Sequence, residues 1–149
     1  MSNGLGSQFT SADDSTGLLL WQVTNRWQAA QRAVLKPFGL THVQFVLLAS
    51  LTWLTSDGPV SQRTLAEHAA TDPMMTSQVV RVLESHGWVT RQVDSEDARA
   101  WALRVTRSGA ALAARANAAV ERCDKKFFAS LGSKGRAAFG STLRTLRDS

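Results

Sequence analysis

The chain has 149 residues, the size of one ordinary domain, which leaves no room for a catalytic domain beside a separate regulatory one. Apolar residues make up 44% of it and charged residues 19%, so a disordered chain and a disulfide-stapled mini-protein are both excluded. The formal net charge of +5 favours an anionic partner. Basic and acidic residues balance at three each in residues 1–60 and at six each in residues 61–107, whereas residues 108–149 hold eight basic and three acidic residues.

The single cysteine, Cys123, cannot close an intramolecular disulfide, and no charged segment followed by an apolar one opens the chain. We therefore expect the protein in a reducing cytoplasm. The longest apolar runs, such as residues 45–49, are far shorter than the ~20 residues that cross a bilayer. The sequence predicts a soluble protein with no membrane partner.

Residues 1–14 are mainly small and polar, which predicts a flexible tail. A long amphipathic helix is expected over about residues 15–36, because apolar positions recur at alternating spacings of three and four until Pro37 stops the pattern. Thr41 is a good N-cap for a second, strongly apolar helix that ends near the turn at residues 56–59.

Two short helices at close quarters follow. Ser61 caps the first, over about residues 62–69, and Asp72 caps the second, over about residues 73–86, before Gly87 ends it. A tight break separates the two. This pairing predicts a helix-turn-helix unit.

The second short helix has two distinct faces. Its apolar spacing predicts a buried stripe made of Met75, Val79, Val82 and Leu83. The opposite face is then exposed to solvent or to a partner. The residues expected on it are Pro73, Met74, Thr76, Ser77, Gln78 and Arg81.

A β-hairpin is expected next. Two β-favouring runs, residues 88–93 and 101–106, flank the charged turn at residues 94–99. A long alanine-rich helix and a last apolar helix then fill about residues 107–147. The alanine-rich helix repeats the three-and-four spacing of the first long helix, a spacing typical of helices that pack on other helices.

The predicted fold class is mainly α with a small β-hairpin wing, an α+β arrangement in which residues 15–149 form one domain. A winged helix-turn-helix covers about residues 41–107. The N- and C-terminal helices, about residues 15–36 and 107–147, are expected to form a dimerisation region, because their apolar faces expose more apolar surface than a monomer of this size leaves in water.

Two short helices followed by a hairpin have the order of a winged helix-turn-helix, whose second helix enters the DNA major groove. Short polar side chains and an arginine read base edges there, and an arginine at the hairpin tip suits the negative minor groove. Taken singly, such residues are equally typical of a solvated surface, but in this order they favour double-stranded DNA as the partner. The candidate DNA-binding residues are Ser61, Gln62, Arg63, Pro73, Met74, Thr76, Ser77, Gln78, Arg81 and Arg99.

Three stretches resemble the MarR family of bacterial transcriptional regulators: residues 62–68 (QRTLAEH), 79–89 (VVRVLESHGWV) and 94–109 (DSEDARAWALRVTRSG). The wing is the most specific, with an acidic-Asp-x-Arg pattern that leads to Thr-x-x-Gly at a helix start. The family usually carries two adjacent wing arginines, and this chain keeps only the second, Arg99. The family pattern implies that Asp97 anchors Arg99 and so supports the wing.

The resemblance extends from about residue 17 to residue 146 and implies a homodimer in which the first and the last two helices of each subunit interlock. It also implies a DNA-binding regulator, expected here to be a ligand-responsive repressor of a pseudo-palindromic operator whose half-sites lie ~10 bp apart. Completion of a monomeric core is the alternative role of the apolar residues assigned to the dimer. The candidate interface residues are Leu20, Trp21, Val23, Phe127, Phe128, Leu131, Phe139, Leu143 and Leu146.

Members of the family typically lose DNA affinity when a small, often aromatic or phenolic, ligand lodges between the dimer helices and the winged part. Several side chains are candidates to line such a cleft, although the same residue types at helical spacing are also typical of plain core. The candidate effector residues are Trp27, Gln31, His42, Phe45 and Trp53.

We expect no cofactor and no metal site, because the three histidines are scattered and none lies on the alanine-rich helix. Cys123 falls on that helix at one of the repeating apolar positions and is expected to act as a small buried hydrophobic residue. The alternative is a reactive thiol whose pKa is lowered by the neighbouring Arg122, Lys125 and Lys126.

The sequence contains no G-x-S-x-G, H-E-x-x-H, P-loop or dinucleotide-binding motif, so we expect no enzyme. The remaining alternative is a winged-helix adaptor that binds proteins without specific DNA binding. The two hypotheses differ in their salt dependence, because a DNA-binding repressor loses duplex affinity steeply as salt rises.

Overall fold

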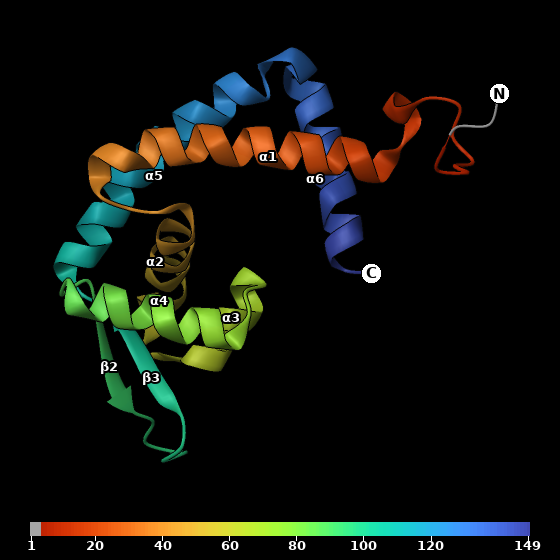
Figure 1. The fold of residues 1–149 in the computed structure, drawn as a ribbon. Coiled ribbons are helices and arrows are strands. Elements are labelled where there is room, and N and C mark those ends of the chain that lie inside the picture. The colour runs from red at the N-terminus through yellow and green to blue at the C-terminus, as the bar shows by residue number, and fades with distance from the viewer. Residues whose placement is uncertain (1–3) are drawn as a thin grey trace.

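The computed structural model describes residues 4–149 (Figure 1). The helices and strands, in chain order, are α1 (Thr16–Leu35), α2 (His42–Leu54), β1 (Val60–Ser61), α3 (Gln62–Ala69), α4 (Pro73–Ser85), β2 (Val89–Val93), β3 (Trp101–Val105), α5 (Arg107–Phe127) and α6 (Gly132–Arg147). Every helix and both hairpin strands predicted from the sequence are confirmed, with ends within about three residues of those expected.

The predicted tail is only partly described. Residues 4–14 are exposed, but Ala12–Asp14 form a short 3-10 turn in which the Ser11 hydroxyl accepts a hydrogen bond from the Asp13 amide. Residues 1–3 of the predicted tail lie outside the described residues. Within residues 4–149, no single helix is both long and apolar enough to cross a membrane.

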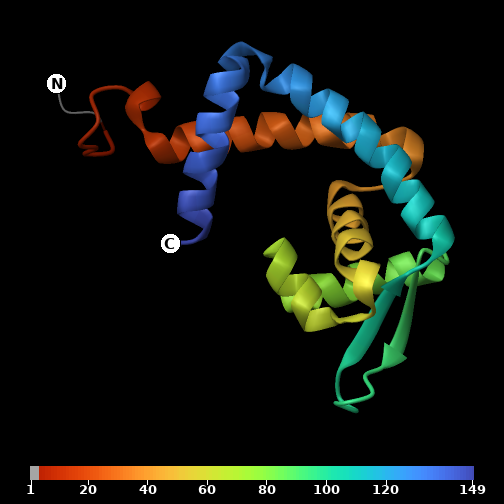
Figure 2. The same cartoon turned by 180° about the vertical axis from the view of Figure 1, so that it is seen from behind.

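The molecule has two lobes (Figures 1 and 2). Helices α1, α5 and α6 form the helical lobe, and α2, α3, α4 and the three-stranded sheet form the winged lobe, whose β2–β3 hairpin projects away from α1. In the sheet, β3 lies between β1 and β2, and both neighbours run antiparallel to it. The short strand β1 was not predicted, because two residues are too few to show an alternating pattern.

The core lies in the winged lobe and at its junction with the helical lobe. Leu47, Leu48 and Leu51 of α2 are fully buried, and they belong to one cluster with Leu83 of α4 and Leu103 of β3. Each fully buried leucine contributes about 1.5–3 kcal/mol to stability through removal of apolar surface from water. The winged lobe therefore holds its shape within a single subunit.

Hydrogen bonds join the turn that follows α4 to the start of α5. Gly87 turns the chain with φ +76°, and its carbonyl accepts a hydrogen bond from the Thr106 hydroxyl at 2.7 Å. The Thr106 amide donates to the Trp88 carbonyl at 2.9 Å, and the same hydroxyl caps α5 by accepting from the Gly109 amide. A Cβ at Gly109 would collide with the Trp88 carbonyl. Only glycine therefore fits this crossing, which ties the winged lobe to α5.

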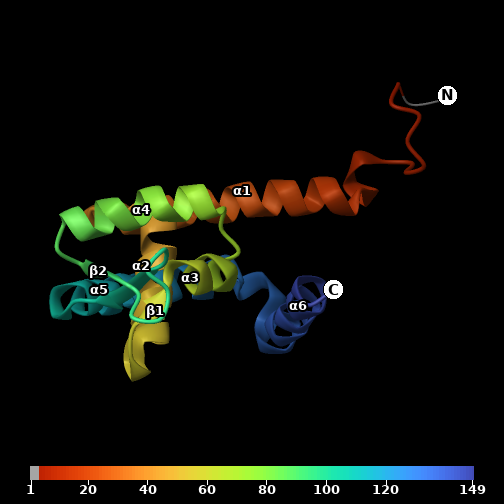
Figure 3. The same ribbon diagram turned by 90° about the horizontal axis from the view of Figure 1, so that it is seen from below.

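Helix α6 packs little against the rest of its own subunit. It contributes no buried residue, and its apolar Leu143 and Leu146 are 42% and 64% exposed. Viewed from below, α6 stands apart from the winged lobe (Figure 3). A helix that leaves this much apolar surface in water is typical of one that packs against a partner.

Candidate nucleic-acid interface

The buried face of α4 differs from the predicted one. Its buried residues are Thr76, Val80 and Leu83, spaced by four and three, whereas the predicted core residues Met75 and Val82 are 40% and 39% exposed. The prediction used side-chain polarity to choose the inward face. Polarity is a poor guide for Thr76, because a threonine can be buried when its hydroxyl is hydrogen-bonded.

Thr76 is therefore wrongly predicted as a DNA contact. Its side chain is fully buried, and its hydroxyl donates to the Asp72 carbonyl at 2.8 Å and lies 2.7 Å from the Thr71 hydroxyl. Both bonds tie the first turn of α4 to the preceding loop. Thr76 shapes the start of the helix from inside the protein.

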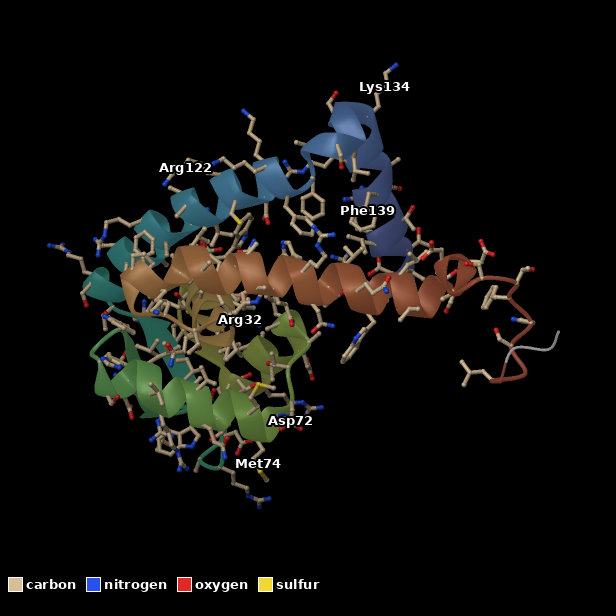
Figure 4. All side chains as sticks on the ribbon, turned by 45° about the horizontal axis from the view of Figure 1, so that its top comes forward. Arg32, Asp72, Met74, Arg122, Lys134 and Phe139 are labelled. Atoms are coloured by element: carbon tan, nitrogen blue, oxygen red, sulfur yellow. The ribbon has the colours of Figure 1, made fainter. Side chains whose placement is uncertain are left out.

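The outward side of α4 carries the other predicted contacts. Pro73, Met74, Gln78 and Arg81 are exposed, Met74 at 71%, and Ser77 is half-buried at the edge of the same side. Figure 4 shows Met74 projecting from α4 on the side away from α1. We call Pro73, Met74, Gln78 and Arg81 the reading face, since amide and guanidinium groups on one exposed helix face are suited to base edges.

At the start of α3, only one of the three predicted contacts is freely exposed. The Ser61 hydroxyl accepts from the Thr64 amide at 3.0 Å as the helix cap, and Gln62 is half-buried with its Oε1 atom enclosed. Arg63 is exposed and pairs with Glu67 at 3.1 Å. An exposed pair of this kind is weak, so the Arg63 guanidinium is available to a phosphate.

Carboxylates hold the wing turn together through its backbone. Asp94 Oδ1 accepts from the Glu96 amide at 2.8 Å and from the Asp97 amide at 3.2 Å. Asp97 Oδ1 in turn accepts from the Arg99 amide at 3.0 Å. The carboxylate of Asp97 thus orders the backbone that carries Arg99, while the Arg99 side chain is exposed at the hairpin tip.

The positive charge of the chain lies away from the reading face. Residues 61–107 carry six basic and six acidic residues, and the excess belongs to residues 108–149. Figure 4 shows Arg122 of α5 and Lys134 of α6 on the side of the molecule opposite Met74. The position of a few side chains, and not a local excess of charge, must therefore govern contacts at the reading face.

The candidate dimer residues form exposed or half-buried apolar surface on the helical lobe. Trp21 and Leu20 of α1 are 69% and 54% exposed. Phe127, Phe128 and Phe139 are half-buried in contact with one another, with successive ring centroids 5.1 and 5.9 Å apart. The remaining candidates are also exposed, at 42% for Val23, 44% for Leu131, 42% for Leu143 and 64% for Leu146.

A polar cluster joins α1, α2 and α5 at the junction of the lobes. Asp124 Oδ1 accepts hydrogen bonds from Trp27 Nε1 and Gln31 Nε2, both at 2.8 Å, and the His42 ring lies edge-on to Trp27 with centroids 5.0 Å apart. We call these four residues the Asp124 cluster. Gln31 is fully buried, yet its Oε1 atom has no hydrogen-bond partner among the described residues. An enclosed acceptor of this kind is costly unless a donor reaches it.

Sequence reasoning missed Asp124. The residue lies 97 positions from Trp27, but one signal for it was present, because it follows the buried Val120 by four positions on α5 and so lies on the same face of the helix. Burial lowers the pKa of His42 below its ordinary value, Arg32 lowers it further, and Asp124 opposes both. His42 is therefore neutral at pH 7.

Two of the candidate effector residues, Phe45 and Trp53, lie outside the Asp124 cluster. Phe45 is 6% exposed and belongs to the core. Trp53 is 82% exposed, and because it follows His42 by eleven residues on α2 it lies about 16 Å farther along the helix. The prediction that Trp53 shares a cleft with Trp27 and His42 is therefore wrong.

Cys123 lies half-buried on α5, where it lines an apolar groove of about 730 Å³ with Val34, Phe38 and Phe127. Burial raises the pKa of the Cys123 thiol, Asp124 raises it further, and Lys126 opposes them. These surroundings disfavour a reactive thiolate. Among residues 4–149, no three histidine, cysteine or acidic side chains gather where they could hold a metal ion.

Comparison with known proteins identifies the family. A family model described as MarR family matches residues 40–101. The HTH-type transcriptional regulator YdcH of Bacillus subtilis is 41% identical over 124 residues, which cover 83% of this chain and 84% of YdcH. The HTH-type transcriptional repressor Rv2887 of Mycobacterium tuberculosis is 35% identical over 136 residues, which cover 91% of this chain and 96% of Rv2887.

Solved structures agree with these relatives. The crystal structure of Rv2887 in complex with DNA covers 90% of this chain and 98% of its own, with 32% identity and a TM-score of 0.72. The structure of CouR from Rhodococcus jostii, bound to p-coumaroyl-CoA, covers 93% of this chain and 95% of its own, with 25% identity and a TM-score of 0.82. With its winged helix-turn-helix, its exposed α4 face and its wing, the chain belongs to the MarR family of DNA-binding transcriptional regulators.

Proposed function

We propose that the chain is a cytoplasmic, homodimeric repressor that binds a pseudo-palindromic operator and releases it when a small aromatic or phenolic effector binds. It acts by binding alone and catalyses no reaction. The observation that carries the proposal is the exposure of the reading face on α4 and of Arg99 at the hairpin tip of the same lobe. A helix and a hairpin so placed can enter adjacent grooves of one duplex.

The expected base and phosphate contacts follow from exposure. Gln78 and Arg81 carry the hydrogen-bonding groups of the reading face, and Met74 offers an apolar contact to a thymine methyl group. Arg63 at the start of α3 suits a phosphate, and Arg99 suits the minor groove. Two copies related by a twofold axis present this set twice, about one helical turn of DNA apart.

The exposed apolar residues of α1 and α6 support the homodimer. Trp21, Leu143 and Leu146 lie on helices that find no cover for them within their own subunit. Burial of such surface against a second copy is favourable at roughly 25 cal/mol per Å². The likeness to Rv2887, whose structure contains DNA, favours this assembly over a protein-binding adaptor.

The Asp124 cluster is the proposed effector site. It joins α1 and α5 of the helical lobe to α2 of the winged lobe, so a ligand placed there contacts both. Trp27 supplies an aromatic surface, and the enclosed Gln31 Oε1 atom is an unpaired acceptor that a phenolic hydroxyl can satisfy once the surrounding side chains move apart to admit it. CouR, a structural neighbour, binds p-coumaroyl-CoA, which contains a phenolic group.

A DNA-binding titration tests the function. The wild-type dimer is mixed with the DNA upstream of its own gene and with a scrambled duplex of the same composition, at several salt concentrations. We expect the upstream duplex to bind at least about 1,000-fold more tightly, with an affinity that falls steeply as salt rises. A folded dimer that shifts neither duplex at low salt would contradict the proposal and favour the adaptor.

A further inference from the structure

Arg91 is an arginine of the hairpin that the DNA contacts do not use. It lies in the middle of β2 opposite Leu103, which is fully buried, so its side chain points to the inner face of the sheet. The side chain is only 16% exposed. A guanidinium held this far inside is out of reach of the DNA backbone.

The guanidinium of Arg91 touches two other elements. Its Cζ atom lies 4.2 Å from the ring centroid of Trp101, at the start of β3 beside the wing turn. Its Nε atom lies 3.4 Å from Glu84 Oε2, in the last turn of α4. One side chain thus connects the reading helix to both strands of the wing. We call Arg91, Glu84 and Trp101 the Arg91 clamp.

Stability alone explains this arginine poorly. The Nη1 atom of Arg91 is buried and lacks a hydrogen-bond partner among the described residues, and an enclosed unpaired donor is unfavourable. The ion pair with Glu84 is only partly buried and therefore adds little stability, so apolar side chains of similar volume would hold the sheet as well. What they cannot supply is a fixed orientation between a carboxylate on one element and an aromatic ring on another.

We propose that Arg91 is a positioning residue for DNA reading, which fixes the wing relative to α4 through Glu84 and Trp101. This inference rests on the proposed function, because it requires that α4 and the wing engage one duplex together. Arg81 and Glu84 are three residues apart on α4, and Arg99 and Trp101 are two apart beside the wing turn. The clamp therefore joins the two contact regions within one helical turn of Arg81 and two residues of Arg99.

The planar guanidinium makes the proposal testable by a substitution that keeps the charge. Lysine carries the same charge as arginine, but it has no Nε–H that can bond Glu84 while a planar group lies over the Trp101 ring. If Arg91 acts only as positive charge, Arg91→Lys is neutral. If it acts through geometry, Arg91→Lys lowers the affinity for a specific duplex and spares the affinity for a scrambled one.

The experiment measures the affinity of the full-length homodimer for two duplexes. One is the duplex that the wild-type protein selects from a randomised pool, and the other is its scrambled counterpart. We expect Arg91→Lys to weaken binding to the selected duplex about tenfold, with unchanged binding to the scrambled duplex and an unchanged salt slope. Arg104→Lys, on the exposed side of β3, is the matched control and should stay within about twofold of wild type.

Glu84→Gln provides a second, gentler variant, because Glu84 is more exposed than Arg91 and the change preserves side-chain shape. We expect Glu84→Gln to bind the selected duplex about threefold more weakly than wild type. The double variant with Arg91→Lys should bind no more weakly than Arg91→Lys alone, because both substitutions disrupt the same contact between Arg91 and Glu84. Glu84→Gln decides the test if Arg91→Lys fails to fold.

Two results would overturn the clamp while leaving the repressor intact. One is Arg91→Lys binding the selected duplex as tightly as wild type. The other is an equal loss of affinity for both duplexes, which would assign Arg91 to general attraction. If the wild-type dimer selects no duplex at all, the repressor and the clamp fail together.

Discussion

The two lobes differ in where their apolar surface and their charge lie. The winged lobe buries its leucines within one subunit and has balanced charge in residues 61–107, whereas α6 buries nothing and the basic excess sits in residues 108–149. The lobe that reads DNA is thus complete but carries no excess of positive charge. The lobe that attracts polyanions is incomplete without a partner. Net charge and DNA recognition are therefore separate properties of this chain, and substitutions can separate them.

The largest expected effect is at the crossing that joins the lobes. Gly109→Ala places a methyl group against the Trp88 carbonyl, which is backbone and cannot swing aside. We expect the free energy of unfolding to fall by about 3 kcal/mol, measured by urea denaturation. Gly17→Ala, which meets nothing within 4 Å, is the control and should change it by less than about 0.5 kcal/mol. If Gly109→Ala is as stable as wild type, close packing of Gly109 on the Trp88 carbonyl is not what ties the winged lobe to α5.

Two exposed tryptophans, one on each lobe, distinguish the dimer surface from ordinary surface. Trp21 of α1 is 69% exposed and Trp53 of α2 is 82% exposed in a single subunit. We expect Trp21→Ala to raise the dimer dissociation constant about 30-fold, measured by sedimentation, because a buried aromatic anchor is worth about 2 kcal/mol. Trp53→Ala should leave it unchanged. The opposite pattern would move the interface to the winged lobe.

Two arginines, one on each lobe, separate contact from general attraction. Arg99→Ala should weaken binding to the selected duplex about tenfold and reduce the slope of log affinity against log salt by about 1, because one phosphate or minor-groove contact is lost. Arg122→Ala removes the same charge on the side opposite Met74 and should change affinity by less than about twofold. Equal effects of the two variants would show that charge, wherever it lies, governs binding.

The smallest expected effect is a pH dependence of stability at the Asp124 cluster. Because the folded-state pKa of His42 lies below its unfolded value of about 6.5, the unfolded chain binds the extra proton first. Stability from this group is therefore complete above about pH 6.5 and declines as the pH falls toward the folded-state pKa. His42→Phe should flatten the decline in free energy of unfolding between about pH 7 and pH 5. An identical pH profile for this variant would contradict the assignment.

Much of the fold was predictable because its signals are local. N-caps such as Thr41, Ser61 and Asp72 mark helix starts in the sequence, and each accepts the expected amide hydrogen bond in the structure. The wing turn and its arginine were equally visible in the charged run at residues 94–99. These features depend on neighbours in the chain, which a sequence displays directly.

The candidate site was predicted less well where distant contacts decide. The inward side of α4 was misassigned because Thr76 hides its hydroxyl in bonds to Asp72 and Thr71. Asp124 and Arg91 were missed because their roles come from partners on other elements, at Trp27 and Glu84. Residue type and spacing indicate a side chain's chemistry, but only the packed structure shows what it faces.

The central claim is that α4 and the wing, and not the basic C-terminal helices, contact the DNA. Hydrogen exchange of the full-length dimer, with and without the selected duplex, tests this claim most directly. We expect slower exchange over residues 73–82 of α4 and residues 94–100 of the wing when the duplex is bound, and little change over residues 134–147 of the basic α6. Slower exchange concentrated in α5 and α6, with an unchanged α4 and wing, would contradict it.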